Sequence, residues 1–134
     1  MAGANLDLVR SIYADWARGD FSHVEWADPD IEWVAIDGLT PGISRGIAAM
    51  GAAWREFVTE WDDFRAEAEE YRELDDGRVL ALHRFSGRGR TSGIAVGPTG
   101  AAGACLFRIR HGMVATLSLY SVRDHAFSDL GLEE

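Results

Sequence analysis

The feature that most constrains this chain is a change in hydrophobic period near residue 61. Between residues 46 and 61, apolar side chains recur every three to four positions, which is typical of an amphipathic helix. After this point, small or apolar residues alternate with charged ones in FRAEAEEYREL. A period of two is typical of a strand with one face in solvent. The chain is therefore predicted to place helices first and an antiparallel sheet after them.

The same patterns predict the individual elements. A helix is expected to begin near Asn5, a plausible N-cap, and to end at Gly19. Asp76-Gly77 is the strongest hairpin signal, and His111-Gly112 is expected to form the tight turn between the last two strands. The remaining predictions are a short helix at 21–28, a first strand at 31–37, a helix at 46–61, strands on both sides of each hairpin turn, and a C-terminal helix at 123–132.

This order of elements predicts a single α+β domain over residues 1–134. A chain of 134 residues is long enough to bury a substantial core. Helices segregated to one side of a curved antiparallel sheet define the α+β class. A curved sheet capped by helices encloses a concave pocket, which is where small molecules bind.

The composition excludes several classes of function. The net charge of −9 argues against nucleic acid or an anionic membrane surface as a partner. The sequence has no lysine, so Schiff-base chemistry is excluded, and Cys105 is its one cysteine, so no intrachain disulfide forms. Its four histidines show no metal-ligand spacing, and we expect no metal and no cofactor. With no apolar leader segment and no run of about 18 apolar residues, a cytoplasmic location is expected.

Four stretches give the chain a resemblance to a known superfamily. They are WARGDF, IEWVAIDGLTPGISRGIAAM, VLALHRFSGRGRTSG and FRIRHGMVATLSLYSVRDHAFSDLGL. The chain resembles the nuclear transport factor 2-like superfamily, which includes ketosteroid isomerase, SnoaL-type polyketide cyclases, scytalone dehydratase and limonene epoxide hydrolase. The last stretch is especially similar to SnoaL-like proteins. The resemblance implies a cone-shaped curved sheet with N-terminal helices around a pocket, a fold also called cystatin-like.

The resemblance to ketosteroid isomerase points to Asp37 as a candidate general base. Asp37 and Gly46 match the base and the glycine that opens the next helix. A solvated Asp-Gly turn is the alternative interpretation. The oxyanion donors do not carry over, because the tyrosine position falls on Ile12, next to Tyr13, and the protonated aspartate position falls on Cys105. Steroid isomerisation is therefore disfavoured, since such donors supply a large share of the catalysis.

His83 is the candidate partner of Asp37. Strand alternation puts Val79, Ala81, His83 and Phe85 on one face, which by similarity to the fold faces the cavity. A histidine can act there as acid, base or hydrogen-bond donor, or it can be an ordinary hydrogen-bonded core residue. A largely apolar pocket is expected, with substrate-binding residues Trp33, Tyr13, Trp54, Phe85, Cys105 and Leu119; the Cys105 thiol is expected to be buried.

Two hypotheses for function follow. The first is a SnoaL-like, cofactor-independent enzyme of the isomerase, cyclase, dehydratase or epoxide-hydrolase type, acting on a small apolar or aromatic ligand, with Asp37 as base and His83 as partner. The second is a non-catalytic ligand-binding or dimerising module. The sequence leaves open whether the pocket is catalytic. A homodimer is expected through the opposite, apolar sheet face, made of Leu80, Leu82, Leu106, Val114, Thr116, Ser118, Tyr120 and Val122.

Overall fold

The structure is a computed structural model of the chain. It describes residues 2–36, 42–58, 61–75, 77–89, 95–96 and 102–132. Asp37, the predicted base, and most of the glycine-rich stretch after residue 89 lie outside the described residues.

Three helices and seven strands make up the described part of the chain. The helices are α1 (Ala2–Ala17), α2 (Ile47–Val58) and α3 (Arg123–Leu130). The strands are β1 (Ala27–Ala35), β2 (Gly42–Arg45), β3 (Trp61–Asp75), β4 (Arg78–Gly89), β5 (Ala95–Val96), β6 (Ala102–Arg110) and β7 (Met113–Tyr120). The predicted change of period is confirmed, although Trp61 begins β3 and does not end the preceding helix.

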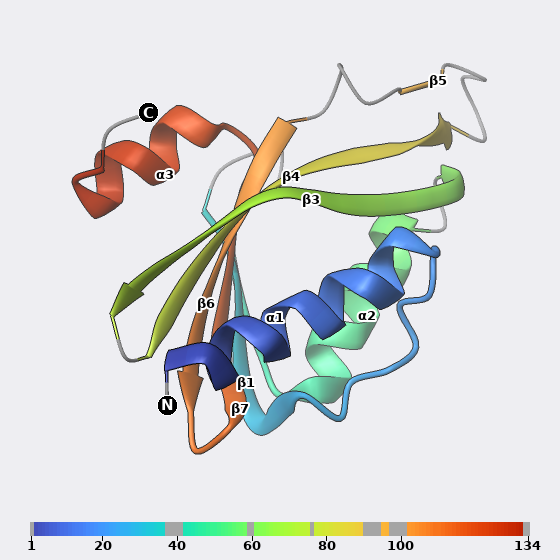
Figure 1. The fold of residues 1–134 in the computed structure, drawn as a ribbon. Helices are drawn as coiled ribbons and strands as arrows, with labels where there is room; N and C mark the ends of the chain where they lie inside the picture. Colours follow the sequence, from blue (N-terminus) through green and yellow to red (C-terminus); the bar gives the residue numbers. More distant parts are fainter. Residues whose placement is uncertain are drawn as a thin grey trace.

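All described strands belong to one curved sheet, in the order β2-β1-β7-β6-β4-β3, with β5 paired to β4 (Figure 1). The pairs are antiparallel except β1 with β7, which run parallel. The predicted curved antiparallel sheet is confirmed, with this one parallel pair as an exception. The two long strands β3 and β4 form the predicted hairpin, and His111 and Gly112 form the predicted tight turn, with φ of 56° and 75°.

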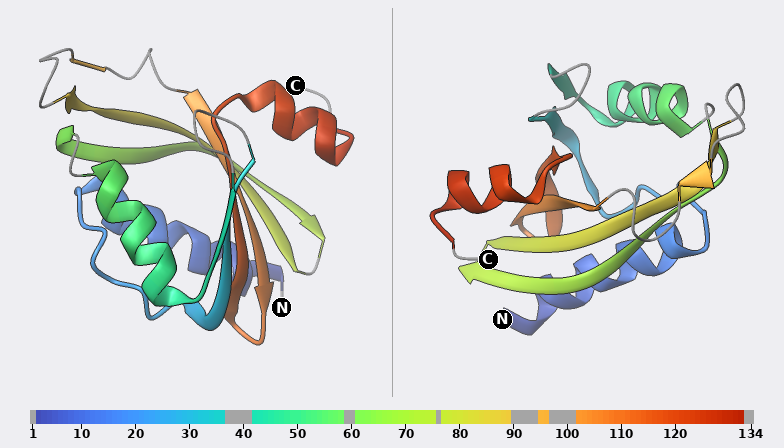
Figure 2. Two further views of the ribbon diagram at one scale, coloured as in Figure 1. Left: turned by 180° about the vertical axis from the view of Figure 1, so that it is seen from behind. Right: turned by 90° about the horizontal axis from the view of Figure 1, so that it is seen from above.

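Helices α1 and α2 both pack in the larger core, whereas α3 packs in a separate core and lies apart from them (Figure 2). Their apolar side chains fill the larger core against the concave face of the sheet. Val9, Ile12, Tyr13 and Trp16 of α1 recur at helical spacing, and all are buried. No helix in the described ranges is long and apolar enough to cross a membrane.

The predicted short helix at 21–28 is wrong. Residues 21–24 are irregular, and β1 already begins at Ala27, which pairs with Val114. The Asp20 side chain accepts hydrogen bonds from the backbone and hydroxyl of Ser22, at 3.0 and 2.6 Å. Such local side-chain bonds compete with helix formation. Strand β2 was also unpredicted, because a strand of four residues gives too short a pattern to recognise.

The outer face of the sheet is partly covered by α3. Ala126 and Phe127 of this helix pack in a second core with Leu80, Leu82 and Tyr120. The predicted dimer face was therefore wrong at Leu80, Leu82 and Tyr120, which are buried in this second core. It was also wrong at Val114, which is buried in the larger core. A register shift between Arg108 and Ile109 changes which side of the sheet this end of β7 faces.

Candidate functional site

His83 lies on the concave face of β4, where alternation predicted it. Its strand neighbours Val79 and Ala81 belong to the larger core, while Leu80 and Leu82 belong to the core under α3. The side chain of His83 is 0% exposed. A buried imidazole must find partners inside the protein.

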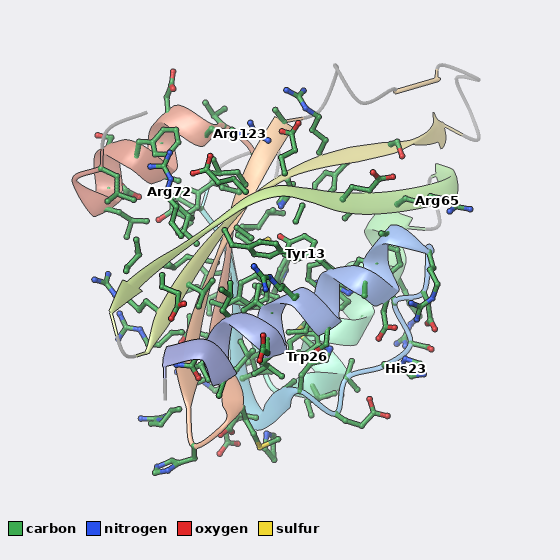
Figure 3. The ribbon with its side chains drawn as sticks, in the orientation of Figure 1. Tyr13, His23, Trp26, Arg65, Arg72 and Arg123 are labelled. Atoms are coloured by element: carbon green, nitrogen blue, oxygen red, sulfur yellow. The ribbon has the colours of Figure 1, made fainter. Side chains whose placement is uncertain are left out.

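The imidazole of His83 is hydrogen-bonded to Tyr13, which lies on α1. The Tyr13 hydroxyl and His83 Nδ1 are 2.9 Å apart. Tyr13 is also within hydrogen-bonding reach of the Cys105 side chain on β6. Figure 3 shows Tyr13 between α1 and the sheet. A tyrosine, a histidine and a cysteine from three elements therefore meet in the core; we call Tyr13, His83 and Cys105 the buried triad.

All three groups of the buried triad are neutral near pH 7. The pKa of His83 is lowered to about 3, chiefly by burial and also by the positive charge of Arg123, while Glu69 partly opposes the shift. Burial also raises the pKa of the Cys105 thiol to about 12, and raises the pKa of Tyr13 well above its usual value. Desolvation disfavours whichever form is charged, which explains the opposite directions. His83 is therefore a neutral imidazole.

The second ring nitrogen of His83, Nε2, has no hydrogen-bond partner among the described residues. It lies over Gly103, the residue that pairs with His83 across β4 and β6. A Cβ added at Gly103 would lie 2.9 Å from His83 Nε2 and 2.7 Å from the Tyr120 carbonyl oxygen. Only glycine leaves room for the imidazole in this position.

Arg123 holds the same strands from the other side of the sheet. Its guanidinium donates to the His83 carbonyl oxygen at 2.8 Å and to the Gly103 carbonyl oxygen at 3.1 Å. Glu69 pairs with both Arg123 and Arg84. Figure 3 places Arg123 at the beginning of α3, on the far side of the sheet from Tyr13. These bonds fix the backbone that carries His83.

Four of the predicted substrate-binding residues remain partly exposed on the concave side. Trp33, Trp54, Phe85 and Leu119 pack against the larger core but keep some accessible surface. The Phe85 ring stacks on the His83 ring, with centroids 4.3 Å apart and planes 23° apart. We call these four side chains the concave apolar set. The other two predicted residues, Tyr13 and Cys105, are buried behind it in the triad.

Trp54 anchors the concave apolar set to the core. Its ring centroid lies 5.4 Å from Trp16, 5.9 Å from Trp26 and 5.6 Å from Trp33. Two of these pairs have the edge-to-face geometry that aromatic rings prefer. The aromatic residues therefore hold α2 against α1 and β1 and keep a rigid wall on the concave side.

A hollow lies on the other side of Trp26, which forms part of its lining. It has a volume of about 670 Å³ and opens between α1 and the segment before β1. Its lining includes Asp15, which together with Asp20 and His23 presents ligand-type atoms within 4.8 Å of one another. Arg18 pairs with Asp15 and supplies a positive charge there. The sequence did not reveal this cluster, because it joins a helix end to an irregular loop.

Gly103 provides a direct test of the packing around His83. Substitution of Gly103 by Ala should lower the free energy of unfolding by about 1–3 kcal/mol, because the new methyl group would overlap backbone and imidazole atoms. Chemical denaturation measures this change. Gly42→Ala is the matched control, since a Cβ there meets nothing within 4 Å. Equal stability of the two variants would contradict the described packing.

Burial of a neutral His83 also predicts a dependence of stability on pH. The unfolded chain binds a proton on this imidazole below about pH 6.5, whereas the folded protein does not until about pH 3. Folded wild type should therefore lose about 1.4 kcal/mol for each pH unit between these values, or about 2 kcal/mol by pH 5. Denaturation of wild type and His83→Asn at pH 7 and pH 5 measures the difference.

His83→Asn keeps a polar atom near the Tyr13 hydroxyl but does not titrate. Its stability should therefore fall less than that of wild type as the pH is lowered. His111→Asn removes an exposed histidine from a turn whose φ of 56° asparagine also adopts, and serves as the control. The prediction is wrong if His83→Asn and wild type lose the same stability between the two pH values.

Comparison with known proteins gives the fold. No protein-family model matches the chain, and no match was found among curated proteins. Solved structures do match, including Bal32a from a soil-derived mobile gene cassette, with a TM-score of 0.74, 24% identity, and 89% of each chain covered.

Two further solved structures agree with this match. An NTF2-like protein from Burkholderia pseudomallei has a TM-score of 0.76 and 19% identity, covering 93% of this chain and 95% of its own. A putative SnoaL-like polyketide cyclase from Jannaschia sp. CCS1 has a TM-score of 0.71 and 14% identity, covering 88% and 85%. Other matches have ketosteroid isomerase-like and cystatin-like folds. The chain thus has the nuclear transport factor 2-like fold predicted from its sequence.

Proposed function

We propose that the protein binds a small, mostly apolar or aromatic molecule on the concave side of its sheet. The observation that carries the proposal is the concave apolar set, which remains partly exposed around a buried histidine that lacks one hydrogen-bond partner among the described residues. Apolar walls with one or two polar groups are typical of small-molecule sites. The matched polyketide cyclase has the same fold, and fold alone does not assign its activity to this chain.

The rigidity of the wall supports this proposal. Trp33 and Trp54 are fixed by edge-to-face contact with centroids 5.6 Å apart. Phe85 is fixed by stacking on His83. Rings held in place before binding lose little conformational freedom when a ligand arrives, and a flat ligand can stack on them.

Catalysis with Asp37 as general base is the extension of this proposal. Ala35 is on β1 beside Leu119 of the concave apolar set, and Asp37 follows two residues later in the sequence. A neutral His83 can orient a substrate or donate a hydrogen bond to it while a carboxylate removes a proton. Proton transfer next to a carbonyl, cyclisation and dehydration are the reaction types that such a pair serves.

A thermal-shift screen of aromatic polyketides, terpenoids and steroids tests the binding proposal. A ligand at 100 times its dissociation constant should stabilise wild type by about 2.7 kcal/mol. Phe85→Ala should weaken the same ligand at least about tenfold, because it removes one wall of the site. His111→Asn changes an exposed side chain in the turn between β6 and β7 and should leave binding unchanged.

Asp37→Asn separates binding from catalysis when the compounds that bind are also assayed for turnover. If Asp37 is the base, this variant keeps affinity and loses turnover of any compound that wild type converts. If Phe85→Ala and His111→Asn bind every ligand as wild type does, the concave site is refuted.

We also propose that two copies pair through the part of the outer sheet face that α3 leaves open. Ile43 is 67% exposed there and pairs across the strands with Val34, and Ile36 is 37% exposed. Exposed apolar groups of this kind favour association. Sedimentation equilibrium should give a dimer for wild type and a shift toward monomer for Ile43→Asp. A monomer at micromolar wild-type concentration would contradict the proposal.

A further inference from the structure

We infer that His83 presents a neutral Nε2–H donor to an acceptor oxygen of the bound molecule, so that the ligands of this site are planar apolar compounds carrying a carbonyl or similar oxygen. The inference rests on the proposed function and deepens it. His83 acts as the hydrogen-bond donor to the ligand. Tyr13 determines which ring nitrogen of His83 carries the proton.

The arrangement of donors in the buried triad indicates which nitrogen of His83 carries the proton. Tyr13 has one hydroxyl proton and two neighbours, His83 Nδ1 at 2.9 Å and the Cys105 thiol. A phenol hydroxyl is a strong donor and an imidazole nitrogen is a strong acceptor, whereas sulfur is a weak acceptor. The stronger arrangement is therefore the one in which the Tyr13 O–H donates to His83 Nδ1. The proton of the neutral imidazole then lies on Nε2.

An Nε2–H group in this position is a donor without a partner among the described residues. Atoms of this kind cost about 1–3 kcal/mol when left unsatisfied in a protein interior. Gly103 leaves space beside Nε2, but no described residue places an acceptor there. A group that becomes satisfied only when a ligand binds explains why the nitrogen is kept in this state.

The position of Nε2 places it beside the concave apolar set. Gly103 and Cys105 alternate on the concave face of β6, and Nε2 lies over Gly103. Cys105 pairs with Leu119 on β7, and Leu119 is partly exposed. The Phe85 ring stacks on the imidazole and is itself partly exposed. A ligand in contact with Leu119 and Phe85 reaches the buried Nε2 when these side chains move aside.

The chemistry of the donor defines the ligand class. A neutral N–H prefers a carbonyl, enol or phenolic oxygen, and the apolar set prefers a flat hydrocarbon body. His83 itself is neutral and supplies no charge to hold a carboxylate or phosphate. An aromatic ketone satisfies both requirements.

Two matched probes test this inference, 2-acetylnaphthalene and 2-isopropenylnaphthalene, in which a CH₂ group replaces the carbonyl oxygen. The quantity measured is the ratio of their dissociation constants, from tryptophan fluorescence of the whole chain. His83→Asn keeps a polar atom toward Tyr13 but has none at the position of Nε2, whereas His83→Gln carries its amide nitrogen near that position. The preference for the ketone should fall about tenfold in His83→Asn and be largely kept in His83→Gln.

The outcomes separate the inference from the proposed function. If both probes bind with the same ratio in wild type and both variants, the apolar site stands and the donor role of His83 is overturned. If neither probe binds wild type, the proposed function fails and the inference fails with it. An imidazole ¹H–¹⁵N correlation spectrum of wild type gives a readout that needs no variant. A protonated Nε2 supports the inference, and a protonated Nδ1 overturns it.

Discussion

The hydrogen bond between the Tyr13 hydroxyl and His83 Nδ1 joins the first helix of the chain to the middle of its sheet. The bond lies in a region without solvent, where a polar ring is stable only if it is uncharged and partnered. Burial therefore makes His83 neutral, and the ring needs the space that Gly103 provides. On the other side of the sheet, Arg123 bonds to the carbonyl oxygens of these same two residues. The buried hydrogen bond between Tyr13 and His83 thus constrains which residues can occupy neighbouring positions such as 103.

The separation between a fixed interior and a partly exposed wall is what makes this architecture suited to a small molecule. Tyr13, His83 and Cys105 are buried, while Trp33 and Phe85 in front of them keep accessible surface. The buried groups set the position of a polar atom, and the wall supplies apolar contact area. Specificity in such a site comes from the single polar group, because apolar walls discriminate weakly between ligands of similar shape.

Much of the fold could be predicted from the sequence, because its strongest signals are local. The alternation around His83 correctly separated Val79 and Ala81 from Leu80 and Leu82, since side chains of a strand point to opposite faces. The irregular segment at 21–24 could not be predicted, because pairing of Ala27 with a distant strand overrides the helical pattern. Val114 faces the larger core because of a register shift between β6 and β7, and the sequence pattern does not reveal this shift.

The candidate site was less predictable, because it depends on contacts between elements far apart in the chain. Tyr13 and His83 are 70 residues apart, and no spacing rule connects them. The resemblance placed the tyrosine position on Ile12, one residue from the hydroxyl that reaches Cys105. Gly103 looked like one glycine among 15, and its importance follows only from the atoms that a Cβ would meet.

His83 is a buried, neutral imidazole that is hydrogen-bonded to Tyr13. The most direct measurement follows the ¹⁵N chemical shifts of its two ring nitrogens while the pH of the folded protein is lowered from 8 to 4. We expect one protonated and one unprotonated nitrogen throughout, with no titration in this range. An imidazole that gains its second proton near pH 6.5 would contradict this expectation.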